Sequence, residues 1–287
     1  MRPEELRRLT ERDEVTRGVE NLAGSVCVVT GGASGIGRAV ARSLHDRGAT
    51  VVISDIEQSM LEDAKVDLDV LGVQADVSRR ADVERLAEET LSRYGRVDVV
   101  VNNAGVARVA GFDELTHEDF QWLVDVNLWG VVHGVRTFLP IIERTSRAGF
   151  IVNTASIAGI RTAPRLTAYS ATKFAVVGLT EALDEELTAR GSHVSAGVIV
   201  PGQVRSRIGA SERNRPGGPL GPTVQQSEST SLLEANEVGE IVAEAILRGD
   251  LYIVTHPEQI DSVRARHRRI EQAFEAAGDR PGRASPR

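Results

Sequence analysis

Short apolar runs rich in β-branched residues alternate with longer helical patterns from about residue 25 to residue 255 of this chain. The runs are apolar at nearly every position, which is typical of strands buried on both faces of a parallel sheet. Parallel neighbours need crossover connections, and these connections are right-handed. The alternation therefore predicts an α/β fold, with a doubly wound parallel sheet of about seven strands and helices on both faces.

The expected elements can be given by their residue ranges. The strand candidates are Ser25–Thr30, Thr50–Ser54, Val73–Ala75, Val99–Val101, Phe150–Thr154, Val194–Val200 and Leu251–Val254. The helical segments lie around Ile36–Arg47, Arg80–Tyr94, His117–Glu143, Ala168–Arg190 and Ala235–Arg248. No internal repeat accompanies them, so the pattern indicates one domain, over residues 23–257.

Two appendages flank this domain. Residues 1–22 form a charged N-terminal extension, expected to be a solvated helix, and residues 258–287 are expected to form a C-terminal helix with a disordered tail. Inside the domain, residues 203–235 are rich in Gly, Pro, Ser, Asn and Gln. A loop of that length is unusual in a compact domain unless it is functional, and we expect it to be mobile and to cover a substrate.

Composition argues against several classes of protein. The net charge of −7 disfavours nucleic acid or an anionic membrane as the main partner. No apolar stretch approaches the ~20 residues of a membrane helix, and the first residues lack the apolar core of a secretory signal. The single cysteine, Cys27, lies in an apolar run, fits a reducing cytoplasm and is expected to be buried and inert. No spacing typical of a metal site is present, so none is expected.

A glycine-rich turn, Thr30-Gly-Gly-Ala-Ser-Gly-Ile-Gly37, joins the first expected strand to the first expected helix. Glycines there let the backbone turn sharply and let a pyrophosphate approach the amides. The helix N-terminus then presents unpaired N–H groups and a partial positive charge to the phosphates. The context of strand, turn and helix predicts a Rossmann-type dinucleotide site.

Asp55 ends the second expected strand, 18 positions after Gly37. A carboxylate there can accept both hydroxyls of an adenosine ribose and would repel a 2′-phosphate, which favours NAD over NADP. The next residue, Ile56, brings no counter-charge. Arg38 is the nearby cation, and it can pair with phosphate or with a neighbouring carboxylate. A role for Asp55 as a helix N-cap is compatible with this hypothesis.

Tyr169 and Lys173 lie four positions apart in an expected helix, so their side chains share one face. A free phenol has a pKa near ~10, and a neighbouring ammonium group is expected to lower it. The pair is a candidate general acid/base unit, although such a pair on an exposed helix often has no function. Ser156, 13 positions before Tyr169, is a candidate anchor for a substrate.

Taken together, these residues resemble the short-chain dehydrogenase/reductase family, in its single-domain branch. The resemblance runs from about Leu22 to Pro257. The turn from Thr30 to Gly37 matches the family's TGxxxGxG motif, and Asn102-Asn103-Ala104-Gly105 matches its NNAG motif. Asp76-Val77 resembles the pair that contacts adenine.

The rest of the family pattern lies in the second half of the chain. Asn127, Ser156, Tyr169 and Lys173 fall where the family has its catalytic tetrad. Pro201-Gly-Gln-Val-Arg-Ser206 resembles the PGxVxT motif beside the nicotinamide, with a serine that keeps the hydroxyl of the family's threonine. The implied cofactor-binding residues are Gly31, Ser34, Gly35, Ile36, Gly37, Asp55, Ile56, Asp76, Val77, Asn103, Ala104, Gly105, Tyr169, Lys173, Pro201, Gly202, Val204 and Ser206.

The resemblance implies reversible hydride transfer between NAD and a secondary alcohol or ketone. In oxidation, Tyr169 as phenolate would take the hydroxyl proton, and Lys173 would hold the nicotinamide ribose and stabilise that phenolate. Ser156 would hydrogen-bond the substrate oxygen. Asn127 would interrupt its helix and hold a water that links Lys173 to solvent. Each residue also has an ordinary structural role open to it.

The substrate is expected to be a small molecule, mid-sized and mostly apolar. The segments Val106–Val109 and Ile157–Leu166 and the loop after Pro201 are expected to line its pocket. Their small or apolar members are Ala107, Val109, Ile157, Ile160 and Ala163, and arginines that could bind an anion are Arg161, Arg165 and Arg205.

Two alternatives remain at this stage. One is a carbonyl reductase that uses NADPH; the other is a nucleotide-binding regulator without catalysis, in which at least one tetrad residue would be expected to be lost. Members of the family are commonly dimers or tetramers that assemble through two long helices. A cytoplasmic homotetramer or homodimer is therefore expected.

Overall fold

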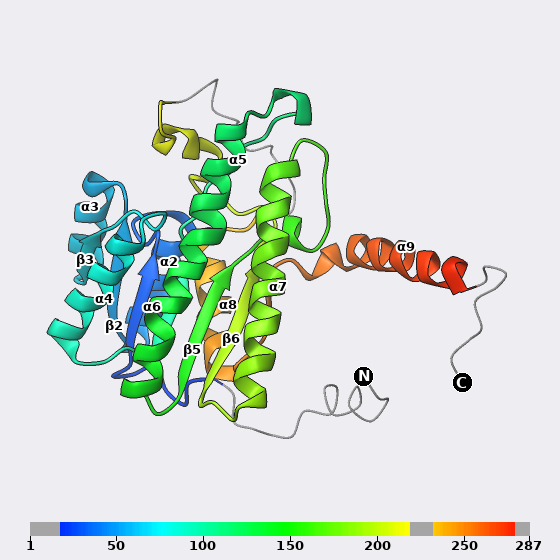
Figure 1. The fold of residues 1–287 in the computed structure, drawn as a ribbon. Helices are drawn as coiled ribbons and strands as arrows, with labels where there is room; N and C mark the ends of the chain where they lie inside the picture. Colours follow the sequence, from blue (N-terminus) through cyan, green and yellow to red (C-terminus); the bar gives the residue numbers. More distant parts are fainter. Residues whose placement is uncertain (1–17, 219–231, 279–287) are drawn as a thin grey trace.

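Seven parallel strands form one sheet, in the order β3-β2-β1-β4-β5-β6-β7, within the residues described by this computed structural model, 18–218 and 232–278 (Figure 1). The strands are β1 (Val26–Thr30), β2 (Thr50–Asp55), β3 (Leu71–Gln74), β4 (Val99–Asn102), β5 (Gly149–Thr154), β6 (Val194–Val200) and β7 (Tyr252–Val254). The order reverses between β1 and β4. In such sheets ligands bind at this switch point, outside the carboxyl ends of the strands.

Eight helices and five short helical segments connect and flank the strands in the described ranges. The helices are α2 (Gly35–Asp46), α3 (Gln58–Leu68), α4 (Arg80–Tyr94), α5 (His117–Val124), α6 (Gly130–Thr145), α7 (Thr167–Ala189), α8 (Ala235–Arg248) and α9 (Ile260–Gly278). The short segments are η1 (Phe112–Glu114), η2 (Asp125–Trp129), η3 (Ile157–Gly159), η4 (Ile208–Asn214) and η5 (Pro257–Gln259).

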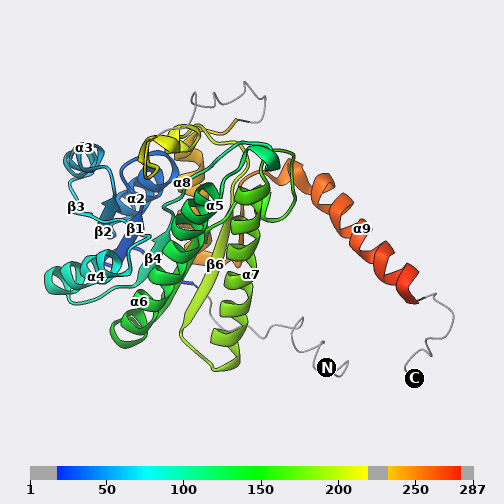
Figure 2. The ribbon, with the colours of Figure 1, turned by 45° about the horizontal axis from the view of Figure 1, so that its top comes forward.

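Helices cover both faces of the sheet, which confirms the expected fold class. Side chains of α2, α3 and α8 pack with Cys27 and Val29 of β1 on one face. Those of α4, α6 and α7 pack with Val28 on the other face, and Figures 1 and 2 show this second layer in front of the sheet. The two layers explain why the strands are apolar at successive positions. Cys27 is fully buried, and burial raises the pKa of its thiol, as an inert cysteine requires.

Two helical segments differ from the expectation. Helix α3 was not expected, because only Leu61, Ala64 and Leu68 are buried in it among many charged residues. The expected helix His117–Glu143 is divided into α5 and α6 by a π-helical turn, η2, which contains Asn127. A π turn inserts an extra residue into the helix and redirects its side chains, and such turns often occur at functional sites.

The ends of the domain also differ in detail from the sequence prediction. Residues 18–22, assigned to the N-terminal extension, pack on the domain, because Val19 and Leu22 are buried and the Val19 N–H donates to the Ile246 carbonyl at 3.2 Å. The rest of the extension, residues 1–17, lies outside the described residues. Helix α9 agrees with the expected C-terminal helix. It projects from the body in Figures 1 and 2 and has no buried residue, and the expected tail from residue 279 is outside the described part.

The expected loop over residues 203–235 is partly helical. Its first half contains η4, and residues 219–231 lie outside the described ranges. Across the described residues, no helix is both long and apolar enough to cross a bilayer. In the same ranges, no group of three or more His, Cys, Asp or Glu side chains is placed to hold a metal ion.

Gly37 gives a direct test of how α2 joins the sheet. A Cβ at Gly37 would lie 2.1 Å from the Gly31 carbonyl oxygen, so Gly37→Ala must displace backbone and should destabilise the fold by about 1–3 kcal/mol. Gly178, on the exposed side of α7, is the matched control, because a Cβ there meets nothing within 4 Å. Gly178→Ala should be neutral or stabilising by up to about 1 kcal/mol. Denaturant unfolding followed by circular dichroism measures both; equal stabilities of the two variants would contradict the argument.

Candidate active site

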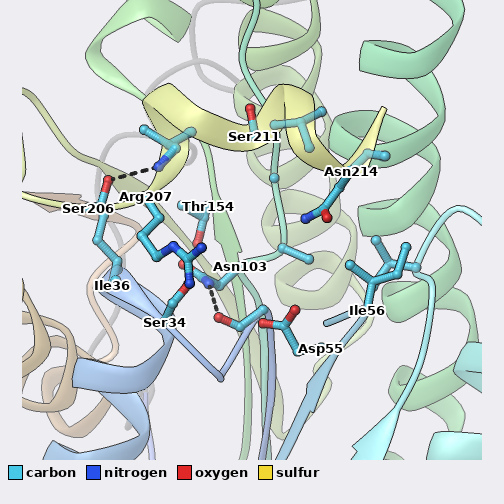
Figure 3. Close-up of a pocket in the computed structure, with 18 of the residues that line it drawn as sticks. Ser34, Ile36, Asp55, Ile56, Asn103, Thr154, Ser206, Arg207, Ser211 and Asn214 are labelled. Carbon is cyan, nitrogen blue, oxygen red and sulfur yellow. Dashed lines mark hydrogen bonds between the residues drawn. The ribbon is translucent and has the colours of Figure 1, made fainter. Parts of the chain in front are cut away.

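A cleft of about 1200 Å³, open mouth included, lies at the carboxyl ends of the central strands and beneath η4 (Figure 3). Most of the cofactor-binding residues expected from the sequence lie on its wall. These are Gly31, Ser34, Gly35, Ile36, Asp55, Ile56, Asp76, Val77, Asn103, Ala104, Gly105, Tyr169, Lys173, Pro201 and Ser206. The structure thus brings together residues from six separate segments at the switch point of the sheet.

The glycine-rich turn is held against the end of β4. Gly31 has a φ of +64°, and a Cβ there would lie 2.9 Å from the Cα of Ala104, so both its conformation and its surroundings favour glycine. The Asn103 side chain donates to the carbonyls of Thr30 and Gly31 at 3.0 and 3.3 Å. Gly37 does not line the cleft; it lies behind the turn, where it lets α2 approach closely.

The start of α2 suits a phosphate. Ser34 is the N-cap, but its side chain makes no capping hydrogen bond, and the first turn of α2 has no acidic residue. The N–H groups of this turn therefore point at the cleft without a carboxylate to neutralise them. This donor set fits a dinucleotide pyrophosphate.

Asp55 lies at the end of β2, at the other side of the turn. Its carboxylate accepts from the N–H of Ala33 at 3.2 Å and from the N–H of Glu57 at 3.1 Å. Burial raises the pKa of Asp55, and these two backbone hydrogen bonds act in the opposite direction. Asp55 is not the N-cap of α3, because that position belongs to Glu57. Its place on the cleft wall fits recognition of a ribose.

Arg38 does not face the cleft. Its guanidinium pairs with Asp67 of α3 at 2.8 Å, which was one of the two roles considered for it. The cations at this end of the cleft are instead Arg207 and Arg213, which come from η4 and its start. Arg213 pairs with Glu57, and Asn214 also donates to Glu57, at 3.1 Å. The sequence placed these residues in the covering loop but gave no sign that they meet the β2–α3 connection.

Ser156 and Tyr169 meet at the opposite end of the cleft. The Ser156 hydroxyl donates to the Pro201 carbonyl at 3.4 Å and accepts from the Ala158 N–H at 3.2 Å. Burial raises the pKa of Tyr169 to about 12, while the nearby Ser156 hydroxyl acts to lower it. The expectation that Lys173 lowers this pKa is therefore wrong for this structure. The spacing of the two residues carries no information about how completely the phenol is buried.

Lys173 is almost completely buried beside the phenol. Its Nζ donates to the Thr154 carbonyl at 2.8 Å and lies 5.7 Å from the centroid of the Tyr169 ring. Burial lowers the pKa of Lys173 to about 8. The amine is therefore still mostly charged at pH 7, yet much closer to neutrality than an exposed lysine.

Asn127 lies behind the cleft wall, in the π turn. Its side chain exchanges two hydrogen bonds with the backbone of Val106, both at 2.9 Å, and donates to the Thr172 hydroxyl at 3.2 Å. A Cβ on Gly105 would lie 3.2 Å from Asn127 Oδ1 and 3.5 Å from Lys173 Nζ. Asn127 and the amine thus flank the same glycine, which brings the four tetrad positions into one region.

The Pro201-Gly202 corner is held by a histidine that sequence reasoning missed. The Gly202 N–H donates to Nδ1 of the buried His256 at 3.1 Å, and His256 Nε2 lies 3.1 Å from the Gln203 carbonyl. Gly202 and Val204 do not line the cleft, whereas Pro201 and Ser206 do. The motif therefore contributes its first and last residues to the cleft, and His256 supports it from behind.

The wall around Tyr169 is mainly apolar. Its side chains are Val106, Trp122, Val126 and Ile208, with the hydroxyl of Ser211. Of the expected pocket segments, Val106–Val109 contributes Val106, while Ile157–Leu166 contributes none. The three arginines considered for an anion also lie elsewhere, with Arg161 near Gln259, Arg165 paired with Glu114 and Arg205 paired with Glu234.

Comparisons with known proteins agree with this geometry. Residues 25–217 match the family model described as short chain dehydrogenase. The CLA biosynthesis dehydrogenase/reductase of Lactiplantibacillus plantarum is 30% identical over 88% of this chain and 95% of its own length. The C alpha-dehydrogenase of a Sphingobium species is 32% identical, over 84% and 83%.

A solved structure extends the similarity to the fold. The short chain dehydrogenase/reductase from Burkholderia phymatum, crystallised in complex with NAD, is 35% identical to this chain. It aligns with a TM-score of 0.82 over 94% of this chain and 100% of its own. The chain therefore belongs to the short-chain dehydrogenase/reductase family of oxidoreductases.

Proposed function

We propose that this chain is an NAD-dependent oxidoreductase that interconverts a secondary alcohol and a ketone. The observation that carries the proposal is the burial of Tyr169 and Lys173 together on the wall of a cleft, with the Ser156 hydroxyl acting on the phenol and with Asp55 at the other end. A regulator that had lost catalysis would have no reason to keep this buried cluster, because burying an amine and a phenol is costly.

The bound nicotinamide would supply the hydride chemistry, and the protein would manage the proton. With a pKa of about 12, Tyr169 holds its proton at neutral pH and is poised to give it to a carbonyl oxygen. In the oxidation direction the phenolate is needed, and the Ser156 hydroxyl, which acts to lower the pKa of the phenol, favours it. Ser156 would also fix the distance of the substrate oxygen from the phenol.

Asp55 supports NAD as the cofactor. Its carboxylate is fixed by two backbone N–H groups at the end of β2, where a 2′-phosphate would meet its charge. The relative from Burkholderia phymatum was crystallised with NAD. Use of NADPH by a carbonyl reductase remains the alternative, and the Asp55 variants below separate the two.

The apolar wall of Val106, Trp122, Val126 and Ile208 supports a mid-sized, mostly apolar substrate. We further propose a cytoplasmic homo-oligomer, a dimer or a tetramer. In support, members of the short-chain dehydrogenase/reductase family commonly assemble in this way, through two long helices.

Tyr169→Phe should lower turnover by roughly a hundredfold or more, the scale of a lost general acid/base, while NADH binding is kept. Tyr252→Phe is the control, because Tyr252 lies on β7 and hydrogen-bonds Glu181, away from the cleft. Rates are measured as NADH absorbance across a panel of secondary alcohols and ketones. Substantial activity of Tyr169→Phe on a substrate of the wild type would remove the phenol from the mechanism.

Asp55→Asn should keep an acceptor for the Ala33 N–H but lose the charge that opposes a 2′-phosphate. We expect affinity for NADH to fall by about 10-fold, the scale of a charged hydrogen bond, and discrimination against NADPH to relax. Asp55→Ala should weaken NADH further, because the turn loses its acceptor. The measurement is the pair of dissociation constants from NADH and NADPH fluorescence. A wild type that already prefers NADPH would contradict the argument.

The raised pKa of Tyr169 predicts its titration in the free protein. The folded pKa is above the ordinary value of 10, so the neutral phenol is favoured and Tyr169 should stay protonated through pH 10. As pH rises further, the unfolded chain loses this proton first, so the contribution of Tyr169 to stability falls. The alkaline absorbance titration of the wild type minus that of Tyr169→Phe measures this. A phenolate signal that is complete below pH 9 would show that burial does not determine the pKa of Tyr169.

A further inference from the structure

Arg207 crosses the cleft from the start of η4 to α3. Its backbone packs on the glycine-rich turn, because a Cβ at Gly35 would lie 3.1 Å from the Ser206 Cβ and 3.9 Å from the Arg207 nitrogen. Its guanidinium reaches Met60 on α3, with Nη1 2.9 Å from the thioether sulfur. Figure 3 labels both Arg207 and Ser34, the N-cap of α2, among the residues that line the cleft.

The guanidinium has only weak partners among the described residues. A thioether is a poor acceptor, and the nearest carboxylate oxygen, on Glu57, is 3.9 Å away. Arg213 and Asn214 bind Oε1 of Glu57, whereas the 3.9 Å contact of Arg207 is to Oε2, which is beyond hydrogen-bond distance. A guanidinium has five N–H donors, so most of the donors of Arg207 are free to bind something in the cleft.

The surroundings of Arg207 select a phosphate. On one side lie the free N–H groups of the first turn of α2, which has no acidic residue. A helix N-terminus and a guanidinium both favour phosphate oxygens, and together they form a two-sided cradle for negative charge. Lys173 and Arg213 do not compete for this role, because Lys173 bonds Thr154 at the other end and Arg213 pairs with Glu57.

We propose that Arg207 is a diphosphate-binding residue that closes, from the η4 side, the phosphate site formed by the glycine-rich turn. The proposal rests on the proposed function in one respect, namely that the cleft holds a dinucleotide. Arg207 lies outside the sequence motifs, so this would be an additional contact to the cofactor. The next residue, Ile208, begins η4 and lines the apolar part of the cleft.

Two other roles for Arg207 make different predictions. If it bound a 2′-phosphate, its loss would weaken NADPH but leave NADH unchanged. If it only fixed η4 against Met60, its loss would lower stability and weaken phosphate-free adenosine as much as NADH. A diphosphate contact should weaken NADH and NADPH by the same factor and spare adenosine.

The test compares Arg207→Gln, Arg207→Lys and the control Arg42→Gln in the full chain. Arg42, on α2, is the control because its substitution removes the same positive charge, while its guanidinium pairs with Asp67 and does not line the cleft. Dissociation constants are measured by fluorescence for NADH and NADPH, and by displacement of NADH for ADP and adenosine. Melting temperatures and the salt dependence of NADH binding accompany them.

We expect Arg207→Gln to weaken NADH, NADPH and ADP by about 10-fold or more, adenosine by less than twofold, and to flatten the salt dependence. Arg207→Lys should restore part of the affinity, and Arg42→Gln should bind as the wild type does. NADH affinity of Arg207→Gln within twofold of the wild type overturns this proposal alone. A loss confined to NADPH, or shared equally by adenosine, also overturns it. A wild type that binds neither dinucleotide overturns both this proposal and the proposed function.

Discussion

The close approach of α2 to the glycine-rich turn is the constraint on which the rest of the site depends. Gly37 has room for no Cβ against the Gly31 carbonyl, and Asn103 ties that same turn to the end of β4. These contacts fix the first turn of α2 at the point where the strand order reverses. The cleft exists there because helices leave in opposite directions on either side of this point.

Burial sets the chemistry at the other end of the cleft. It raises the pKa of Tyr169 and lowers the pKa of Lys173, so it favours the uncharged form of both groups. The nearby Ser156 hydroxyl opposes this effect on the phenol. The protonation of the pair is thus balanced between desolvation and a few polar contacts, and small changes in those contacts will have large effects on it.

Local signals made much of this fold predictable, and contacts between distant segments account for what was missed. Strands and the glycine turn follow from runs of neighbouring residues, and the sequence was sufficient for them. Helix α3 was missed because its apolar stripe is narrow, and the pKa direction of Tyr169 was wrong because burial depends on the whole fold. Glu57 and Arg213 are 156 positions apart, and no local pattern connects them.

Segment η4 then links the two halves of the cleft. Arg213 pairs with Glu57 on the β2 side, while Arg215, just after η4, pairs with the fully buried Asp119 of α5 on the other side. Between them, the backbone of Arg207 packs on the start of α2 and Ile208 packs with the apolar wall. Arg207 and Ile208 are consecutive, and the ion pairs of Arg213 and Arg215 hold their segment on both sides, so a shift of η4 changes both ends of the cleft at once. Affinity for the dinucleotide and fit of the substrate therefore depend on the same element. Substitution of Arg213 or Arg215 should alter both.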